Sequence, residues 1–220
     1  MAKLIMSPLG RMEHEPPHYQ DLLAAVIIKE KSRLVVESGC ESGFGAEYLL
    51  KALESNESGH LYSFDPKPHG LLTVKPIIHP QFTLIQDYSY NLMVPFFMEH
   101  GAFDMFLHDS DHGPGCQTFE YELAWDLLRP DGILATDDRW WGIGPDSIPH
   151  KSWEAFLGRK GIPESSVVVI NNAVYIRKPG WAAEPKLDKA WANSRWLLAA
   201  KQSNAANAKH GLPPYLPDVK

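Results

Sequence analysis

The chain of 220 residues lacks the features that mark several large classes of protein. It has only two cysteines, Cys40 and Cys116, so it can form no disulfide framework, and we expect a reducing, cytoplasmic location. Its longest apolar run, residues 22–28, is too short to span a membrane, and its first residues lack the apolar stretch of a secretory signal. The net charge is -6 with no basic stripe, so we expect neither a nucleic acid nor a membrane as partner.

The length and composition of the chain are those of one globular domain. Hydrophobic residues make up 44% of the chain and charged residues 22%, and a chain of this length can bury a sizeable core without a second full domain. No internal repeat is visible. From the local patterns we divide the chain into an N-terminal arm or lid with a helix at 1–32, a main domain at 33–178, and a C-terminal helix and tail at 179–220.

Short apolar runs alternate with helical patterns along most of the chain. The expected strands are 33–37, 60–64, 82–85, 103–108 and the run that follows a turn at 129–132. Between them, helical spacing predicts helices that include 18–30 and 90–100, and Pro95 is expected in the first turn of the latter. The apolar runs at 167–170 and 173–176 are separated by two asparagines and predict a hairpin with a tight turn. This order predicts an α/β fold, a Rossmann-like doubly wound, mostly parallel seven-stranded sheet with a terminal antiparallel hairpin.

Acidic clusters follow two of the expected buried strands. Residues 108–112 read HDSDH directly after one apolar run, and Asp137-Asp138 follows the next. Neighbouring parallel strands bring their C-terminal ends to the same edge of a sheet, where ligands bind. Carboxylates gathered there repel one another unless a cation or a shared proton offsets the repulsion. The pattern therefore indicates a hard divalent metal ion.

A glycine-bearing turn joins the first expected strand to the following helix. Glu37, Gly39 and Gly43 mark this turn, where the backbone can bend sharply and approach a ligand. The spacing is not that of a dinucleotide fingerprint, and no lysine follows as in a P-loop. Asp65 ends the second expected strand, a place where an acid commonly binds ribose hydroxyls. The alternative is a plain strand–helix turn, with Asp65 as a helix cap.

The glycine turn and the acid after the second strand resemble the S-adenosylmethionine site of class I methyltransferases. Glu37, Gly39, Gly43 and Asp65 match that pattern, and the resemblance covers roughly residues 33–178. It implies that the main domain binds S-adenosylmethionine through these four residues. Asp87, which ends the third strand with Gln86, either contacts the adenine or forms a turn.

The acidic clusters resemble those of metal-dependent O-methyltransferases. An Asp-x-Asp pair, about 25 residues and then Asp-Asp are similar to the macrocin O-methyltransferase-like group, which acts on sugar hydroxyls of natural products. The resemblance implies that Asp109, Asp137 and Asp138 hold magnesium or manganese and that Asp111 is the general base, with His112 as the rival base. Carboxylates with waters suit such an ion, and a metal lowers the pKa of a bound hydroxyl.

Each of these residues has a structural alternative. Asp138 can pair with Arg139, Asp137 can cap a turn, and Asp111 can cap the helix near Cys116. Because side chains alternate along an extended strand, Asp109 and Asp111 are expected on one side, and His108, Ser110 and His112 on the other. His108 is expected to pack beside the sheet. Trp140 and Trp141 either stack on the substrate or belong to the core.

We therefore expect an enzyme, an S-adenosylmethionine-dependent, magnesium-assisted O-methyltransferase acting on a hydroxyl of a small molecule such as a natural product, sugar or catechol-like compound. One alternative is a metal-independent methyltransferase that uses His112 or Asp111 as base. Others are a metal-dependent hydroxylase-like enzyme and a non-catalytic, cofactor-binding regulator. A homodimer is possible, with tryptophans of the C-terminal region at its interface. The identity of the acceptor does not follow from the sequence.

Overall fold

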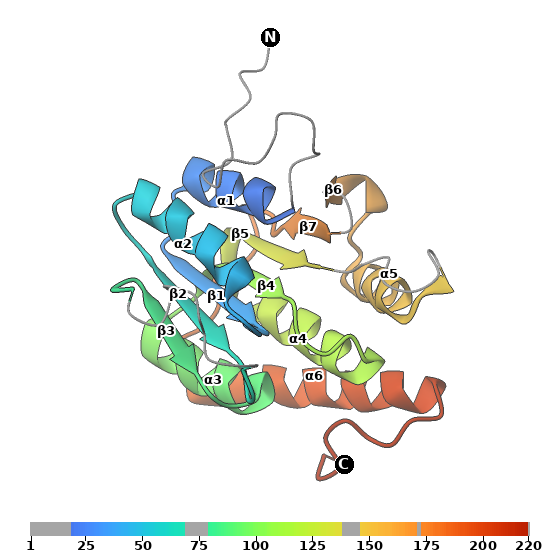
Figure 1. Cartoon of the computed structure of the whole chain (residues 1–220). Helices are drawn as coiled ribbons and strands as arrows, with labels where there is room; N and C mark the ends of the chain where they lie inside the picture. The colour runs from blue at the N-terminus through green and yellow to red at the C-terminus, as the bar shows by residue number, and fades with distance from the viewer. Residues whose placement is uncertain (1–18, 69–78, 138–145, 171–172, 220) are drawn as a thin grey trace.

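A seven-stranded sheet forms the centre of the molecule, as the computed structural model in Figure 1 shows. The structure describes residues 19–68, 79–137, 146–170 and 173–219. The strand order is β3-β2-β1-β4-β5-β7-β6. The first five strands pair in parallel, and β7 runs antiparallel to both β5 and β6. The strands are β1 (Leu34–Ser38), β2 (His60–Phe64), β3 (Phe82–Ile85), β4 (Phe103–His108), β5 (Leu128–Thr136), β6 (Val168–Ile170) and β7 (Ala173–Arg177).

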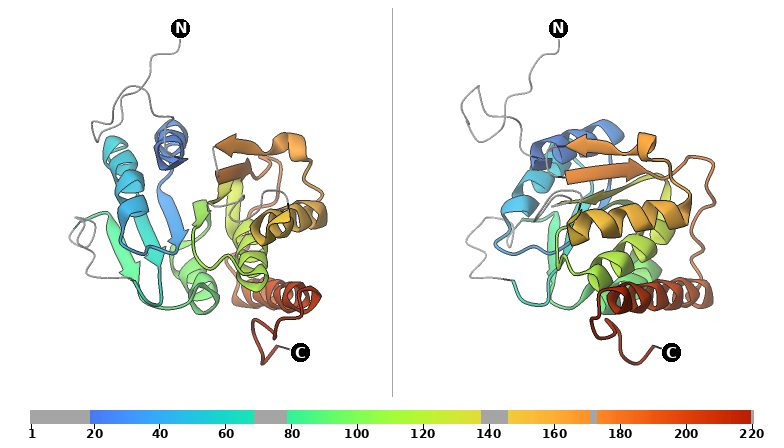
Figure 2. Two further views of the ribbon diagram at one scale, coloured as in Figure 1. Left: turned by 45° about the vertical axis from the view of Figure 1, so that its right-hand side comes forward. Right: turned by 90° about the vertical axis from the view of Figure 1, so that its right-hand side faces the viewer.

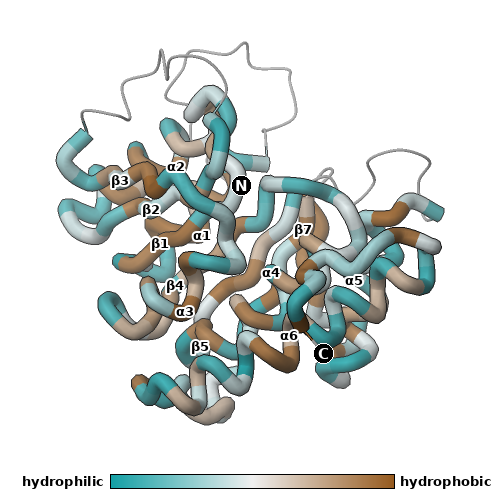
Figure 3. The backbone as a smooth tube through the Cα atoms, turned by 90° about the horizontal axis from the view of Figure 1, so that it is seen from below, coloured by the Kyte–Doolittle hydropathy of each residue, from teal (hydrophilic) through white to brown (hydrophobic). Residues whose placement is uncertain are grey.

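Helices cover both faces of this sheet because alternate strand residues are apolar on both sides. Val35 packs with residues of α1 (Tyr19–Glu30) and α2 (Phe44–Ser55), whereas Val36 packs with residues of the other helices. Those are α3 (Ser89–His100), α4 (Pro114–Leu127), α5 (Ile148–Lys160) and α6 (Lys189–Lys209). Figure 2 shows the two helical layers, and Figure 3 shows apolar residues on the central strands. The predicted doubly wound, mostly parallel fold with a terminal hairpin is confirmed.

Two local expectations were wrong. Pro95 lies inside α3 and not in its first turn. Proline removes one backbone donor from a helix, but Met93, Val94 and Phe97 around it are buried in the core, and this packing holds the helix together. Residues 129–132 do not precede β5 as a turn, since they belong to the strand itself. The register with β4 shifts there and Asp131 has a φ of 62°, so the turn residues form an irregularity within the ladder.

The C-terminal segment packs on the start of α4. Ser203 of α6 donates a hydrogen bond to the carbonyl oxygen of Gly115 at 2.7 Å. A Cβ atom on Gly115 would lie 2.6 Å from Oδ1 of Asn207, so this helix contact requires glycine. Asn204 then fixes the tail by hydrogen bonds with both backbone groups of Leu216. The division of the chain at 32 and 178 stays a prediction. Among the described helices, none combines the length and apolarity that crossing a membrane would require.

Candidate functional site

The residues that directly follow four parallel strands form a row along the C-terminal edge of the sheet. Gly39 N–H donates to the carbonyl of Phe64 at 2.8 Å, and Asp65 N–H donates to that of Ile85 at 3.2 Å. Asp109 N–H donates to the carbonyl of Ser38 at 2.9 Å, and Asp137 N–H to that of His108 at 3.1 Å. The ladder thus continues one residue beyond each strand. It brings the ends of the glycine turn and of both acidic clusters together.

Gly39 lies where two loops touch. Its φ is +84°, a conformation that side chains rarely adopt, and a Cβ atom there would lie 1.9 Å from the carbonyl oxygen of Asp109. Gly43, with a φ of 80°, precedes the first residue of α2. The glycines of the predicted turn are therefore required by its geometry, at Gly39 by the close approach of the loop after β4.

Glu37 and Asp65 stand on either side of this turn. The buried carboxylate of Glu37 accepts a hydrogen bond from Ser63 Oγ at 2.6 Å. Burial raises the pKa of Glu37 to about 7, with a smaller contribution from the charge of Asp65, although the Ser63 hydrogen bond opposes the shift. Asp65 Oδ2 accepts from the N–H groups of Cys40 and Glu41 at 3.0 and 2.9 Å.

Asp65 therefore holds the glycine turn by direct hydrogen bonds. Its Oδ1 accepts one further hydrogen bond, from Lys67 N–H at 2.8 Å. A carboxylate offers about four acceptor positions, so one remains for a ligand hydroxyl. The ribose contact of Asp65 stays a prediction. Asp87 is half-buried and accepts from Tyr88 N–H and Asn91 Nδ2 at 2.7 and 2.9 Å, as the turn alternative expected. Its contact with an adenine stays a prediction as well.

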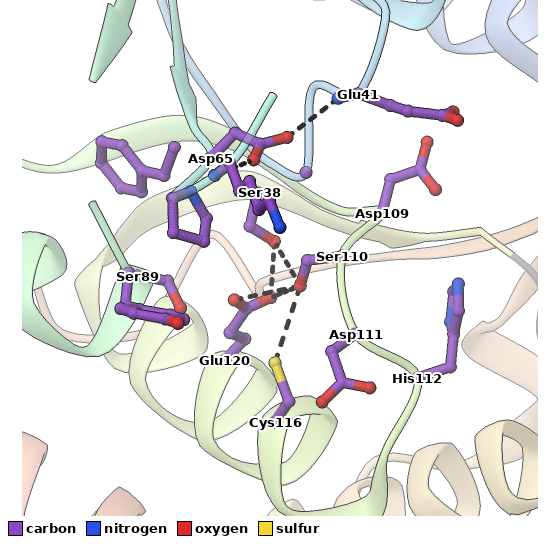
Figure 4. A pocket seen from close by; sticks show the side chains of 15 residues that line it. Ser38, Glu41, Asp65, Ser89, Asp109, Ser110, Asp111, His112, Cys116 and Glu120 are labelled. Carbon is purple, nitrogen blue, oxygen red and sulfur yellow. Dashed lines mark hydrogen bonds between the residues drawn. The ribbon is translucent and has the colours of Figure 1, made fainter. Parts of the chain in front are cut away.

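Two cavities open at this edge and share Gly39, Glu41 and Asp109. The first, of about 490 Å³, extends from Asp65 past Tyr88 to the loop after β4, and Figure 4 shows its lining. The second, of about 310 Å³, lies on the α1 and α2 side and is lined by Tyr19, Glu37 and Asp137 among others. Asp109 stands between the two, so a ligand could extend from one cavity to the other past its backbone.

The loop after β4 does not follow the expected alternation of faces. β4 ends at His108, and the chain bends at Ser110. Asp109 lines both cavities, whereas Asp111 and His112 line only the first, beside Ser110. Asp111 Oδ1 accepts from Gly113 N–H at 3.0 Å, in a turn just before α4, but Gly113 is the N-cap residue and no side chain caps this helix, so the alternative of Asp111 as a helix cap was wrong. The expectation that Ser110 and His112 lie opposite Asp109 and Asp111 was wrong.

Tyr19, the first described residue of α1, lies over Asp109. Its hydroxyl donates to Asp109 Oδ2 at 2.9 Å. Burial raises the pKa of the Tyr19 phenol, and the charges of Asp109 and Asp137 raise it further. The N-terminal helix therefore contributes directly to the acidic end of the site, in the region that the sequence assigned to a lid.

Part of the predicted site lies outside the described residues, namely Asp138, Trp140 and Trp141. Two of the three predicted metal ligands, Asp109 and Asp137, line the same cavity. Within the described ranges, no three side chains of His, Cys, Asp or Glu are grouped so that they could hold a metal ion. The metal site and the substrate contacts of the two tryptophans stay predictions.

Sequence reasoning missed Glu120, a fully buried acid beneath the first cavity. Its Oε2 lies 2.5 Å from His108 Nδ1 and accepts a hydrogen bond from Ser38 Oγ. Burial alone would raise the pKa of Glu120, but the charge of His108 and hydrogen bonds from neighbouring side chains lower it overall. One signal was present: Glu120 is at position i+4 from Cys116, on the helix face that Phe119 and Leu123 make apolar. Acidic side chains are almost never fully buried unless they are paired, so an acid on a buried helix face indicates a specific partner.

Comparison with known proteins relates this geometry to a family. Residues 36–139 match a family model described as "Methyltransferase domain". This match confirms the resemblance to methyltransferases and the expectation of an enzyme. No curated protein matches the chain.

Three solved structures illustrate the likeness of fold. The O-methyltransferase TomG from Streptomyces achromogenes, in complex with SAM, is 16% identical with a TM-score of 0.55, over 73% of this chain and 79% of that one. MycE, in complex with Mg, SAH and mycinamycin VI, is 16% identical with a TM-score of 0.54, over 75% of this chain and 50% of its own. The O-methyltransferase from Bacillus cereus, in complex with SAH, is 14% identical with a TM-score of 0.55, over 76% and 84%. At such identities the likeness shows the fold.

Proposed function

We propose that this chain, which carries a methyltransferase domain at residues 36–139, transfers the methyl group of S-adenosylmethionine to a hydroxyl of a small molecule with the help of magnesium or manganese. The observation that carries the proposal is the row Asp65, Gly39, Asp109 and Asp137 at one edge of the sheet, beside two adjoining cavities. SAM or SAH is bound in the TomG and MycE structures, and Mg in the latter.

The chemistry of the cavity lining fits a cationic cofactor. S-adenosylmethionine carries a sulfonium and an ammonium group, and three carboxylates, those of Glu37, Asp65 and Asp109, surround the glycine turn. Gly39 lets the loop after β4 lie directly against the glycine turn, because a Cβ atom there would meet the carbonyl oxygen of Asp109, and this contact places the Asp109 carboxylate beside the turn. Since the sulfonium methyl is already activated, the main task of the protein is to align it with the acceptor oxygen.

The described donors also fit a hard divalent ion. Asp109 and Asp137 would hold it, with Asp138 as the third predicted ligand. When bound there, magnesium would lower the pKa of a coordinated hydroxyl and fix its direction. Asp111, or His112 as the rival base, lines the adjoining cavity and would accept the one proton that the hydroxyl loses.

A metal-independent methyltransferase is the second candidate, and the position of Tyr19 favours it. Its hydroxyl donates to Asp109 Oδ2, an oxygen that a metal ion would use. In this version the Tyr19 hydroxyl holds Asp109 in place, and Asp111 or His112 alone accepts the proton. The two candidates differ in whether the protein binds the ion at all.

Substitution of Asp137 by asparagine should weaken metal binding and leave cofactor binding intact. The amide keeps the shape of the side chain but removes a charged oxygen ligand, so we expect the affinity for Mn²⁺ to fall at least about tenfold. Electron paramagnetic resonance of free Mn²⁺ and calorimetry with S-adenosylhomocysteine measure the two affinities without knowledge of the acceptor. Asp146→Asn, at an exposed site, is the control.

The outcomes separate the candidates. Wild-type protein that binds S-adenosylhomocysteine but no Mn²⁺ would support the metal-independent version. A failure to bind S-adenosylhomocysteine would contradict the cofactor assignment itself. Loss of cofactor binding in Asp137→Asn with unchanged Mn²⁺ affinity would remove Asp137 from the metal site.

A further inference from the structure

We propose that Glu120 is a positioning residue: from α4 its carboxylate ties the end of β1 to the loop after β4 and so fixes the floor of the larger cavity. The inference rests on the proposed function only where it concerns the cofactor, which this cavity would receive. Neither the glycine turn nor the acidic clusters include Glu120, which lines the cavity from α4, and Figure 4 shows its carboxylate next to Ser38 and Ser110.

Side chains from three different elements converge on this carboxylate. Ser38, the last residue of β1, donates to Oε2 at 2.5 Å. Ser110, in the loop after β4, donates to Oε2 and Oε1 at 3.2 and 3.3 Å. His108, the last residue of β4, lies with Nδ1 2.5 Å from Oε2. The two serines also lie 3.5 Å apart, between their Oγ atoms, so the contacts form one connected group.

Burial makes this group depend on Glu120. The exposed fraction is 0% for His108 and 1% for both Ser38 and Glu120, so none of them can turn to water instead. The other ring nitrogen of His108, Nε2, is buried and has no hydrogen-bond partner among the described residues. Glu120 is therefore the polar anchor of the imidazole, and its loss would leave buried groups unsatisfied.

The residues that Glu120 holds are the neighbours of Gly39 and Asp109, where the cofactor is proposed to bind. Ser38 precedes Gly39, and His108 and Ser110 flank Asp109, whose carbonyl lies against the Cα of Gly39. A shift of the loop after β4 would move Asp109 and the cavity wall together. Glu120 thus acts through its neighbours by holding two loops at a fixed separation before any ligand arrives.

The test compares Glu120→Gln with Glu122→Gln. Glu122 is the matched control, because it is also buried on α4 but pairs with Arg159 and Lys160, away from the cavities. Hydrogen–deuterium exchange of the ligand-free proteins reports local opening. We expect exchange at residues 109–113 to be at least about threefold faster in Glu120→Gln than in wild type, and unchanged in Glu122→Gln. Calorimetry should show S-adenosylhomocysteine affinity about tenfold weaker only in Glu120→Gln.

Each outcome decides the proposal. If Glu120→Gln folds and its exchange rate at residues 109–113 equals that of wild type, the proposal is overturned. This holds even if the affinity for S-adenosylhomocysteine is weaker, because Glu120 would then contact the ligand directly. The same acceleration in Glu122→Gln would also overturn it, since the effect would then be general destabilisation. If Glu120→Gln does not fold, Ser38→Ala and Ser110→Ala carry the same exchange test, because each removes one hydroxyl from the carboxylate. Wild-type protein that binds no S-adenosylhomocysteine would contradict the proposed function, whereas the exchange comparison would still decide this inference.

Discussion

Replacement of Gly39 by alanine should abolish cofactor binding and lower the free energy of unfolding by about 3 kcal/mol. The reason is twofold. The positive φ of +84° is unfavourable for alanine, and the new methyl group would lie 1.9 Å from the carbonyl oxygen of Asp109. Backbone must therefore move on one side of the contact, and Asp109 and the glycine turn form the junction of the two cavities. Chemical denaturation and calorimetry with S-adenosylhomocysteine measure the two effects.

The control Gly101→Ala separates the two causes of the destabilisation, the unfavourable φ and the steric contact. Gly101 directly follows the last residue of α3 and has a φ of +88°, close to that of Gly39, but a Cβ atom there would meet nothing within 4 Å. We expect Gly101→Ala to lower the free energy of unfolding by about 1–2 kcal/mol and to leave the affinity for the cofactor unchanged. If Gly39→Ala were no more destabilising than Gly101→Ala and still bound S-adenosylhomocysteine, the close approach of the two loops would not matter for the site.

The sequence was sufficient for the fold because its signals are repeated and independent. Alternating strands and helices predict a parallel sheet, and the closely spaced apolar runs at 167–170 and 173–176 predict the hairpin. Parallel topology then places every strand end at one edge, so Asp109 and Asp137 could be expected together before any coordinates. That inference needs only the order of strands, and it does not depend on the positions of individual atoms.

Features set by tertiary packing were beyond that reasoning. Pro95 continues a helix because its neighbours are buried, and periodicity contains no information on that. The alternation rule failed after His108, since it holds only while the chain stays extended. Glu120 carried a local signal, but its partners lie on other elements: His108 ends β4, and Ser38 ends β1, which is 82 residues away in sequence. Long-range hydrogen bonds of this kind follow from the assembled fold and not from a local pattern.

Glu37 should make the protein less stable as pH rises. Its pKa is raised by burial from 4.5 to about 7 in the folded protein. The folded state therefore binds more protons than the unfolded state between these values, so the favourable contribution is complete below pH 4.5 and is lost as pH rises through about 7. A cation beside Glu37 would favour its ionised form. The affinity for S-adenosylmethionine should accordingly fall as pH drops below about 7.

Glu37→Gln should remove this pH dependence. The amide oxygen can still accept the hydrogen bond from Ser63, but the side chain no longer ionises. Relative to wild type, the free energy of unfolding of the variant should therefore rise by about 2–3 kcal/mol between pH 5 and pH 8. Urea denaturation at several pH values measures this difference, and Glu57→Gln, at an exposed position, is the control. A difference that stays constant with pH would show that the Glu37 carboxyl is solvated in the folded protein, and the proposed link between its ionisation and cofactor affinity would lose its basis.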